Sequence, residues 1–192
     1  MDASKKVKSI DKLPELKGWN NMEDIYLDYV GDILKRDHPG AQSEPIVQYK
    51  NESGRNDLKT LKFASSPKEM GFYVQTNNKL SERNSNNWMV LWLNTDANYN
   101  SGWFGYDYRV INGNRLQQFS NGFWEEFGTV DFVTSANELL IKIPNSTIGL
   151  PANGFNIEFK WSDNMMKDDP LDWYINGDTA PGGRLNLTVG VE

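Results

Sequence analysis

The sequence contains no cysteine. This absence excludes disulfides, a thiolate nucleophile and cysteine-ligated zinc. Histidine is nearly absent as well, and the single His38 excludes a metal site built from several imidazoles. No apolar run approaches the roughly 20 residues that a transmembrane helix requires, and "MDASKKVKSIDKLPE" lacks the apolar segment of a signal peptide. We therefore expect no membrane association, and we interpret residues 1–17 as a polar linker or tail ahead of a single domain at 18–192.

Positive charge is also scarce, because 20 Lys and Arg against 26 Asp and Glu give a net charge of -6. The one basic cluster, Lys5, Lys6 and Lys8, is typical of a solvated tail. Nucleic acids need clustered Lys and Arg, so we expect no nucleic-acid partner. Aromatic residues are abundant by contrast, with seven Trp and 12% aromatics in total. This content, in a chain of 192 residues, predicts a folded domain with a substantial core rather than a disordered chain.

Short apolar runs recur from about Val47 onward, and several of them alternate with period two. In "FNIEFKW" the apolar residues Phe155, Ile157, Phe159 and Trp161 share one face. "WMVLWLN" is apolar on both faces, which predicts a central strand covered on both sides, and "PNSTIGL" predicts one helical turn. Four Asn-Gly pairs favour hairpin turns: Asn112-Gly113, Asn121-Gly122, Asn153-Gly154 and Asn176-Gly177. The pattern predicts an all-β fold, an antiparallel β-sandwich.

One segment conflicts with this pattern. In "MEDIYLDYVGDILKR" the apolar residues from Met22 to Leu34 follow i, i+3, i+4, i+7 spacing. Periodicity alone predicts an amphipathic helix there. Gly31 in the middle of the segment weakens that prediction.

Several longer stretches together resemble a known domain. They are "GWNNMEDIYLDYVGDILKRDHPG", "YKNESGRNDL", "WMVLWLNTDANYNSGWFGYDYRVIN" and "IEFKWSDNM…LDWYINGDTAPGGRLN". These stretches resemble the C-terminal β-sandwich domain of some bacterial glycoside hydrolases and related polysaccharide-degrading proteins. That domain is similar to the family 9 carbohydrate-binding modules and, more distantly, to DOMON-type sandwiches.

The resemblance implies an antiparallel sandwich of carbohydrate-binding-module or DOMON-like jelly-roll type, with an accessory role beside a catalytic domain. It also implies that residues 24–36 are extended rather than helical, and we follow it there against the periodicity. Phe104 departs from the family pattern, which carries an acidic residue at that position.

The loop "TDANYNSGWFGYD" offers oxygen side chains at alternate positions. Asp96, Asn98 and Asn100 are spaced as in the first half of an EF-hand loop, and Asp107 follows. The loop lacks the EF-hand glycine and its bidentate Glu, so it is not an EF-hand. Either these four residues hold a structural Ca²⁺, or the side chains bond their own backbone in a polar turn.

The same loop suggests a sugar-binding surface. Trp103 and Tyr106 flank it, and Trp124 follows another Gly turn, so these rings are candidates for stacking against sugar C–H bonds. For Trp103 and Trp124 the alternative is a lid on the edge of the sandwich. We assign Trp88, Trp92 and Trp161 to the core, whereas Trp173 fits either role.

Arginines and carboxylates complete the candidate list. Arg36 and Arg55 offer donor forks that suit sugar hydroxyls or a uronate, although an internal Arg–Asp network that fixes two loops is the favoured interpretation. Carboxylates are numerous, but a glycosidase needs two at a defined separation, which sequence spacing does not reveal. We predict no catalytic residues.

The leading hypothesis is a non-catalytic carbohydrate-binding module of a secreted, extracellular or cell-surface bacterial protein that degrades polysaccharides. Its partners would be a polysaccharide or oligosaccharide and a covalently linked catalytic domain. One alternative is a structural accessory domain that binds no sugar. A second, less favoured alternative is a haem-binding DOMON-type redox domain that uses His38 and a Met.

Overall fold

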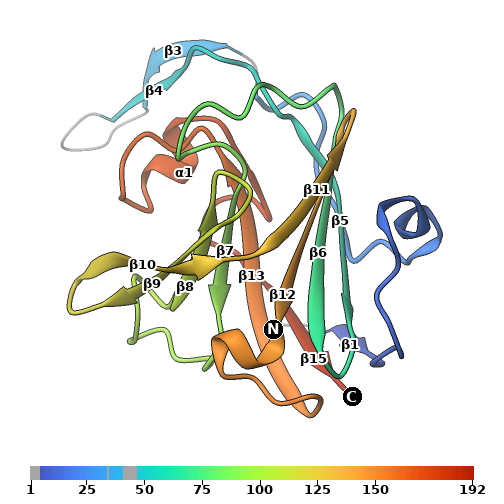
Figure 1. Ribbon diagram of the computed structural model, residues 1–192. Coiled ribbons are helices and arrows are strands. Elements are labelled where there is room, and N and C mark those ends of the chain that lie inside the picture. The colour runs from blue at the N-terminus through green and yellow to red at the C-terminus, as the bar shows by residue number, and fades with distance from the viewer. Residues whose placement is uncertain (1–4, 34, 41–46) are drawn as a thin grey trace.

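The computed structural model describes residues 5–33, 35–40 and 47–192. It is a sandwich of two main sheets (Figure 1). The larger sheet contains, in spatial order, β1 (Lys5–Val7), β15 (Leu187–Val191), β13 (Phe155–Asp163), β7 (Val90–Asn94), β8 (Tyr108–Ile111), β9 (Arg115–Ser120) and β10 (Phe123–Thr129), with β14 (Asp178–Ala180) also paired to β13. The smaller sheet contains β11 (Asp131–Ser135), β12 (Glu138–Pro144), β6 (Glu69–Thr76), β5 (Leu58–Ser65) and β2 (Tyr26–Leu27).

The pairing is antiparallel throughout the two sheets except between β1 and β15, which run parallel. A separate hairpin is formed by β3 (Arg36–Pro39) and β4 (Gln48–Asn51). The helical elements are short: η1 (Leu16–Asn21), η2 (Asn145–Ile148) and α1 (Asp172–Ile175). None of the helices in the described part of the chain is long and apolar enough to cross a membrane. The predicted all-β sandwich is confirmed, and η2 confirms the helical turn predicted in "PNSTIGL".

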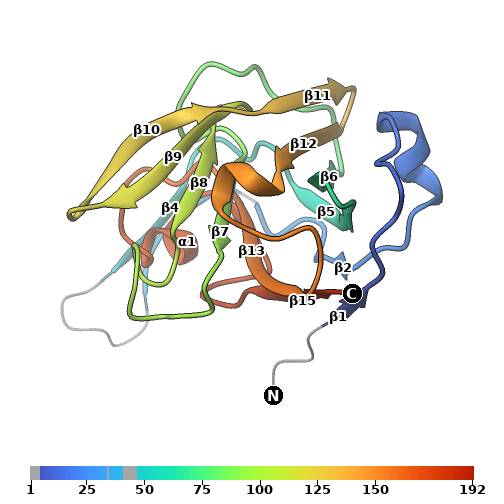
Figure 2. The ribbon, with the colours of Figure 1, turned by 60° about the horizontal axis from the view of Figure 1, so that its bottom comes forward.

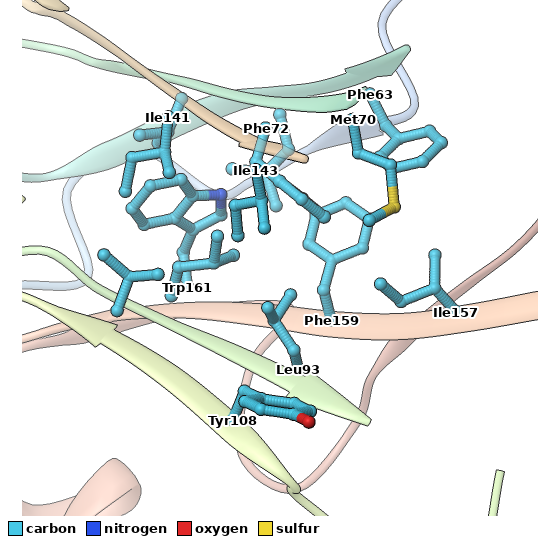
Figure 3. Packing of buried hydrophobic residues seen from close by; sticks show 14 of the residues in the cluster. Phe63, Met70, Phe72, Leu93, Tyr108, Ile141, Ile143, Ile157, Phe159 and Trp161 are labelled. Atoms are coloured by element: carbon cyan, nitrogen blue, oxygen red, sulfur yellow. The ribbon is translucent and has the colours of Figure 1, made fainter. Parts of the chain in front are cut away.

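The core lies between the two sheets, where side chains from both interdigitate (Figure 3). Phe159 on β13 packs with its ring centroid 5.9 Å from that of Phe63 and 5.1 Å from that of Phe72. The predicted apolar face of "FNIEFKW" therefore points into the core, and Trp161 and Ile157 are buried beside Phe159. Burying one such side chain contributes about 1.5–3 kcal/mol relative to exposure.

Strand β7 is buried on both faces, as predicted for a central strand. Leu91 and Leu93 belong to the core between the sheets. Val90 and Trp92 point the other way, into a second apolar cluster on the outer face of the larger sheet. The outer face of this sheet is thus partly covered by other segments of the chain.

Two of the four Asn-Gly pairs make the predicted hairpin turns. Asn112-Gly113 joins β8 to β9 with φ of 49° and 78°, and Asn121-Gly122 joins β9 to β10 with φ of 52° and 87°. Positive φ at both positions is what a type I′ turn requires. In the other two pairs only the glycines, Gly154 and Gly177, have positive φ, and these pairs lie in longer loops.

Residues 24–36 are not helical wherever the structure describes them, and Leu34 lies outside the described residues. β2 is followed by a turn that contains Gly31 at a φ of 100° and then by β3. Ile25 and Ile33 are buried, whereas Tyr29 is 76% exposed, so the helix-like spacing does not correspond to one buried face. The expectation that this segment is not helical is confirmed for its described residues, although residues 30–33 form a turn rather than a strand. The periodicity is misleading, because pairing with β5 decides the conformation of β2.

The prediction that residues 1–17 form a polar linker or tail is wrong for residues 5–17, which pack against the domain. Residues 1–4 lie outside the described residues. β1 adds to the edge of the larger sheet, and the chain then crosses the outer face of β5 and β6 (Figures 1 and 2). Leu13 is 2% exposed there, and Trp19 stacks on Tyr73 with ring centroids 5.7 Å apart. A few well-spaced apolar residues suffice to dock a segment whose overall composition is polar.

Candidate functional site: a groove on the outer face of the larger sheet

A row of side chains crosses the outer face of the larger sheet. The strand registers place Lys160 beside Trp92, Trp92 beside Arg109, Arg109 beside Gln117 and Gln117 beside Glu126. Neighbouring strands lie about 4.8 Å apart, so each residue of the row contacts the next. The row runs from a buried lysine to an exposed glutamate, with an indole and a guanidinium between them.

Arg109 is fixed at the centre of this row. Its Nε donates to Oε1 of Gln117 at 2.7 Å, and its Nη1 donates to Oδ1 of Asp168 at 2.8 Å. The guanidinium carbon lies 4.5 Å from the ring centroid of Trp124 and 5.5 Å from that of Trp92, which adds cation–π attraction. Burial lowers the pKa of Arg109 and the adjacent Asp168 raises it, so the group stays a cation at neutral pH.

A groove of about 430 Å³ opens beside Arg109. Its floor is apolar next to the arginine, where Val90, Trp92 and Ile111 lie. One wall carries amides and a hydroxyl, and the other is the segment from Met165 to Asp168 that leads into α1. α1 itself lies on the side of the larger sheet away from β5 and β6, where Trp173 packs against Trp92 (Figures 1 and 2).

The polar wall is held by a buried ion pair. Arg55 Nε donates to Oδ2 of Asp163 at 2.8 Å, and its Nη2 reaches Oδ1 of Asn87 at 3.3 Å. Asp163 also accepts from Nδ2 of Asn56 at 3.0 Å and from the amide of Met89 at 3.0 Å. Burial raises the pKa of Asp163, and Arg55 opposes that effect. Arg55 therefore holds these loops together by internal contacts of its Nε and Nη2, as the favoured interpretation held.

Arg36, the other predicted arginine, lies outside the groove as well. Its Nη1 donates to the carbonyl of Asp32 at 3.0 Å and its Nη2 to the carbonyl of Ile175 at 3.3 Å. These bonds tie β3 to the end of α1. His38 on the same strand is exposed, with its ring 5.7 Å from that of Tyr49.

The predicted stacking rings at the opening loop are corrected by the structure. Trp103 is 7% exposed and stacks on Trp92 with centroids 4.9 Å apart, while Tyr106 is 2% exposed and donates to Asn186 at 2.5 Å. The loop folds back over the outer face of the sheet and buries both rings, which for Trp103 is the lid that was the alternative interpretation. Trp173 is buried in the same cluster. Trp124 is half-buried, and the guanidinium of Arg109 lies over its ring.

The oxygen side chains of the predicted calcium loop bond their own loop. Oδ1 of Asp96 accepts from the amide of Asn98 at 2.8 Å, and Oδ1 of Asn98 accepts from the amide of Asn100 at 3.0 Å. Oδ2 of Asp107 accepts from the amide of Thr95 at 2.7 Å, and burial raises the pKa of this carboxyl. The contacts of Asp96 and Asn98 are Asx turns, and the contact of Asp107 closes the two ends of the loop, so the loop is fixed without an ion. Calcium at this loop stays a prediction.

Another set of carboxylates has spacing suited to a divalent cation, and the sequence analysis missed it. Oxygens of Asp32, Asp57 and Asp178 lie within 4.8 Å of one another. Two of the three groups already accept backbone amides: Asp57 from Gly31 at 3.0 Å and Asp178 from Leu58 at 2.6 Å. Burial, together with the neighbouring carboxylates, raises the pKa of Asp178 to about 8. In the sequence these three residues end the tripeptides "VGD", "RND" and "NGD", and this recurrence could have pointed to the cluster.

Comparison of the chain with protein-family models, with curated proteins and with solved structures gives no match. The groove therefore has to be interpreted from its own chemistry. Sequence reasoning missed Arg109 and Asp168, although "YRVI" places a charged residue on the face of β8 opposite Tyr108 and Val110. That alternation was a detectable signal for Arg109, whereas no local signal pointed to Asp168.

Proposed function

We propose that this domain is a non-catalytic carbohydrate-binding module whose site is the groove beside Arg109. The observation that carries the proposal is the placement of Arg109, which is locked between two indoles at the centre of the sheet row and lines a groove with an apolar floor. A guanidinium held in this way presents its donors in a fixed plane, so little side-chain entropy is lost when a hydroxyl binds.

The two kinds of surface in the groove match the two kinds of surface on a sugar ring. Hydroxyl groups would accept hydrogen bonds from the N–H groups of Arg109 that Gln117 and Asp168 leave free, and they would form further hydrogen bonds with the side-chain amide of Asn86 or Asn87. The C–H faces of the ring would pack on Val90 and Ile111. This mechanism replaces the stacking on Trp103 and Tyr106 that the sequence suggested, since both rings are buried.

The carboxylates near the groove favour binding over hydrolysis. A glycosidase needs one protonated carboxyl as general acid and a second carboxylate at a set distance. Glu126 accepts hydrogen bonds from Arg115 and from Gln117. Burial acts to raise the pKa of Glu126, whereas the hydrogen bonds from Arg115 and Gln117 act to lower it. The net effect is a lowered pKa. Asp168 is likewise paired with a cation, Arg109. A carboxylate with a lowered pKa, such as Glu126, is a poor general acid.

The proposal includes a setting for the domain. As part of a secreted bacterial protein that degrades polysaccharides, it would hold a glycan near a covalently linked catalytic domain. Tethering raises the effective substrate concentration without any new contact to the catalytic centre. Affinity would then depend on the groove alone.

The test is affinity gel electrophoresis of the domain through gels that contain single polysaccharides from a plant, algal and host panel. We expect wild type to be retarded by at least one polymer and Arg109→Ala to migrate as in a blank gel. Arg184→Ala is the matched control, because Arg184 is exposed and belongs to no wall of the groove. Retardation that persists in Arg109→Ala would place the site elsewhere, and absence of retardation by any polymer would refute the proposal.

The edge position and exposed side chains of β10 favour a second candidate function, that of a structural accessory domain. This strand ends the larger sheet among the described strands, and its Phe123 and Phe127 are 71% and 46% exposed. An exposed edge strand with apolar side chains is a template for protein contact. Sedimentation velocity at rising protein concentration tests this function, since wild type should associate and Phe123→Ser should not. A monomeric wild type at all concentrations would argue against it.

A further inference from the structure

The charges around the groove are balanced in pairs. Arg109 pairs with Asp168 at 2.8 Å, and Arg115 pairs with Glu126. Lys167 adds one charge, but it is exposed to solvent at the rim. The charged residues that line the groove are Arg109, Asp168 and Lys167, and the Arg109–Asp168 pair adds no net charge to the surface that a ligand meets.

The partners of Arg109 decide which ligand groups it accepts. A free guanidinium binds a carboxylate through two parallel hydrogen bonds. Here Nε is occupied by Gln117 and one N–H of Nη1 by Asp168, so among the described contacts both N–H groups of Nη2 and the second one of Nη1 are left to donate. A uronate carboxylate approaching Nη2 would also meet the negative charge of Asp168, and like charges in a partly desolvated groove repel. A hydroxyl meets no such repulsion.

We infer that the groove selects uncharged sugars over uronates, and that Asp168 determines this selectivity by neutralising Arg109. The inference rests on the proposed function, because it concerns the ligand of the same groove. It makes Asp168 a specificity residue: its negative charge excludes acidic glycans and its carboxylate orients the arginine.

Asp168 suits this role because the fold does not depend on it. Its side chain is 59% exposed, and among the described side-chain contacts it pairs with Arg109. It lies in the segment between β13 and α1, next to Asp169, which instead accepts the backbone amide of Leu171 at 2.9 Å. Replacing Asp168 should therefore alter the groove and leave the melting temperature unchanged.

Asp168→Asn tests the inference, with Asp169→Asn as the matched control. Both variants change the net charge by the same amount, so general electrostatic attraction is equal in the two proteins. Each protein is run through gels containing a neutral polymer (a glucan, a xylan or a mannan) or a uronate polymer (polygalacturonate or alginate), at low and at high salt. Melting temperatures of all three proteins are measured in parallel.

We expect wild type and Asp169→Asn to be retarded by a neutral polymer and not by the uronates. Asp168→Asn should gain affinity for uronates of at least tenfold, and the gain should shrink at high salt because exposed charges are screened. Equal or stronger binding of uronates by wild type would overturn the inference, as would an equal gain in both variants. Neither result would affect the proposed function, which fails if wild type is retarded by no polymer or if the retardation persists in Arg109→Ala.

Discussion

Removing Arg55 should destabilise the whole domain, because it leaves a buried carboxylate without its cation. Asp163 has a fully buried side chain, while that of Arg55 is 20% exposed, and the atoms Nε and Oδ2 are 2.8 Å apart. Breaking a buried pair by removing one partner costs about 3–5 kcal/mol. Asp163 keeps its hydrogen bonds from Asn56 and Met89, and Arg55 is partly solvated, so we expect Arg55→Met to lose about 2–4 kcal/mol of unfolding free energy at pH 7.

The pH dependence of that loss distinguishes a lost ion pair from lost packing. Burial raises the pKa of Asp163 above its unfolded value, so the folded state binds a proton that the unfolded state releases. Stability from this group therefore falls as pH rises above about 4. Without Arg55 the folded pKa rises further, and the variant loses more stability on the alkaline side of this window. At acidic pH Asp163 is protonated in both proteins, and the difference between them should shrink.

Urea unfolding followed by tryptophan fluorescence measures the effect, since the midpoint shifts while the slope should not. Arg55→Met/Asp163→Asn is the control, because it removes the buried charge and should recover part of the loss. A destabilisation below about 0.5 kcal/mol, the level of an ordinary surface substitution, would refute the reasoning. So would a loss that does not change between pH 4.5 and pH 8.

Three further predictions concern the core, the acidic cluster and calcium. Phe159→Ala should cost about 3–5 kcal/mol by leaving a cavity between the sheets, and a urea midpoint unchanged from wild type would contradict the packing described for Phe159. The pKa of Asp178 is raised to about 8 in the folded state, so its contribution to stability falls as pH rises from about 4 to 8. Asp178→Asn should flatten that fall in urea midpoints between pH 4.5 and 8, and an equally steep fall in the variant would disprove it. Calcium at a hundredfold excess over Kd would raise the free energy of unfolding by about 2.7 kcal/mol. The melting temperature should therefore be higher in excess calcium than in EDTA, and Asp96→Ala should abolish this difference. A difference that survives Asp96→Ala and disappears in Asp57→Asn would move the ion to the other carboxylate cluster, and identical wild-type melts would exclude it.

Local patterns in the sequence determined the fold class and much of the hairpin structure. Period-two alternation put Phe159 and Trp161 on one face of a strand because successive side chains of any strand point to opposite faces. Asn112-Gly113 and Asn121-Gly122 turned the chain because both residues tolerate positive φ. These preferences act within a few residues, so they can be recognised without knowing what lies on the other side of the sheet.

Tertiary contacts decided the rest, since they depend on segments far apart in the chain. Periodicity suggested a helix before Arg36, but strand pairing with β5 outweighs that weak preference. Trp103 looked exposed beside a glycine turn, yet its loop folds back onto Trp92 and buries the ring. Asp168 is 59 residues from Arg109 in the sequence, and two side chains so far apart become neighbours only when the larger sheet and the segment before α1 pack together.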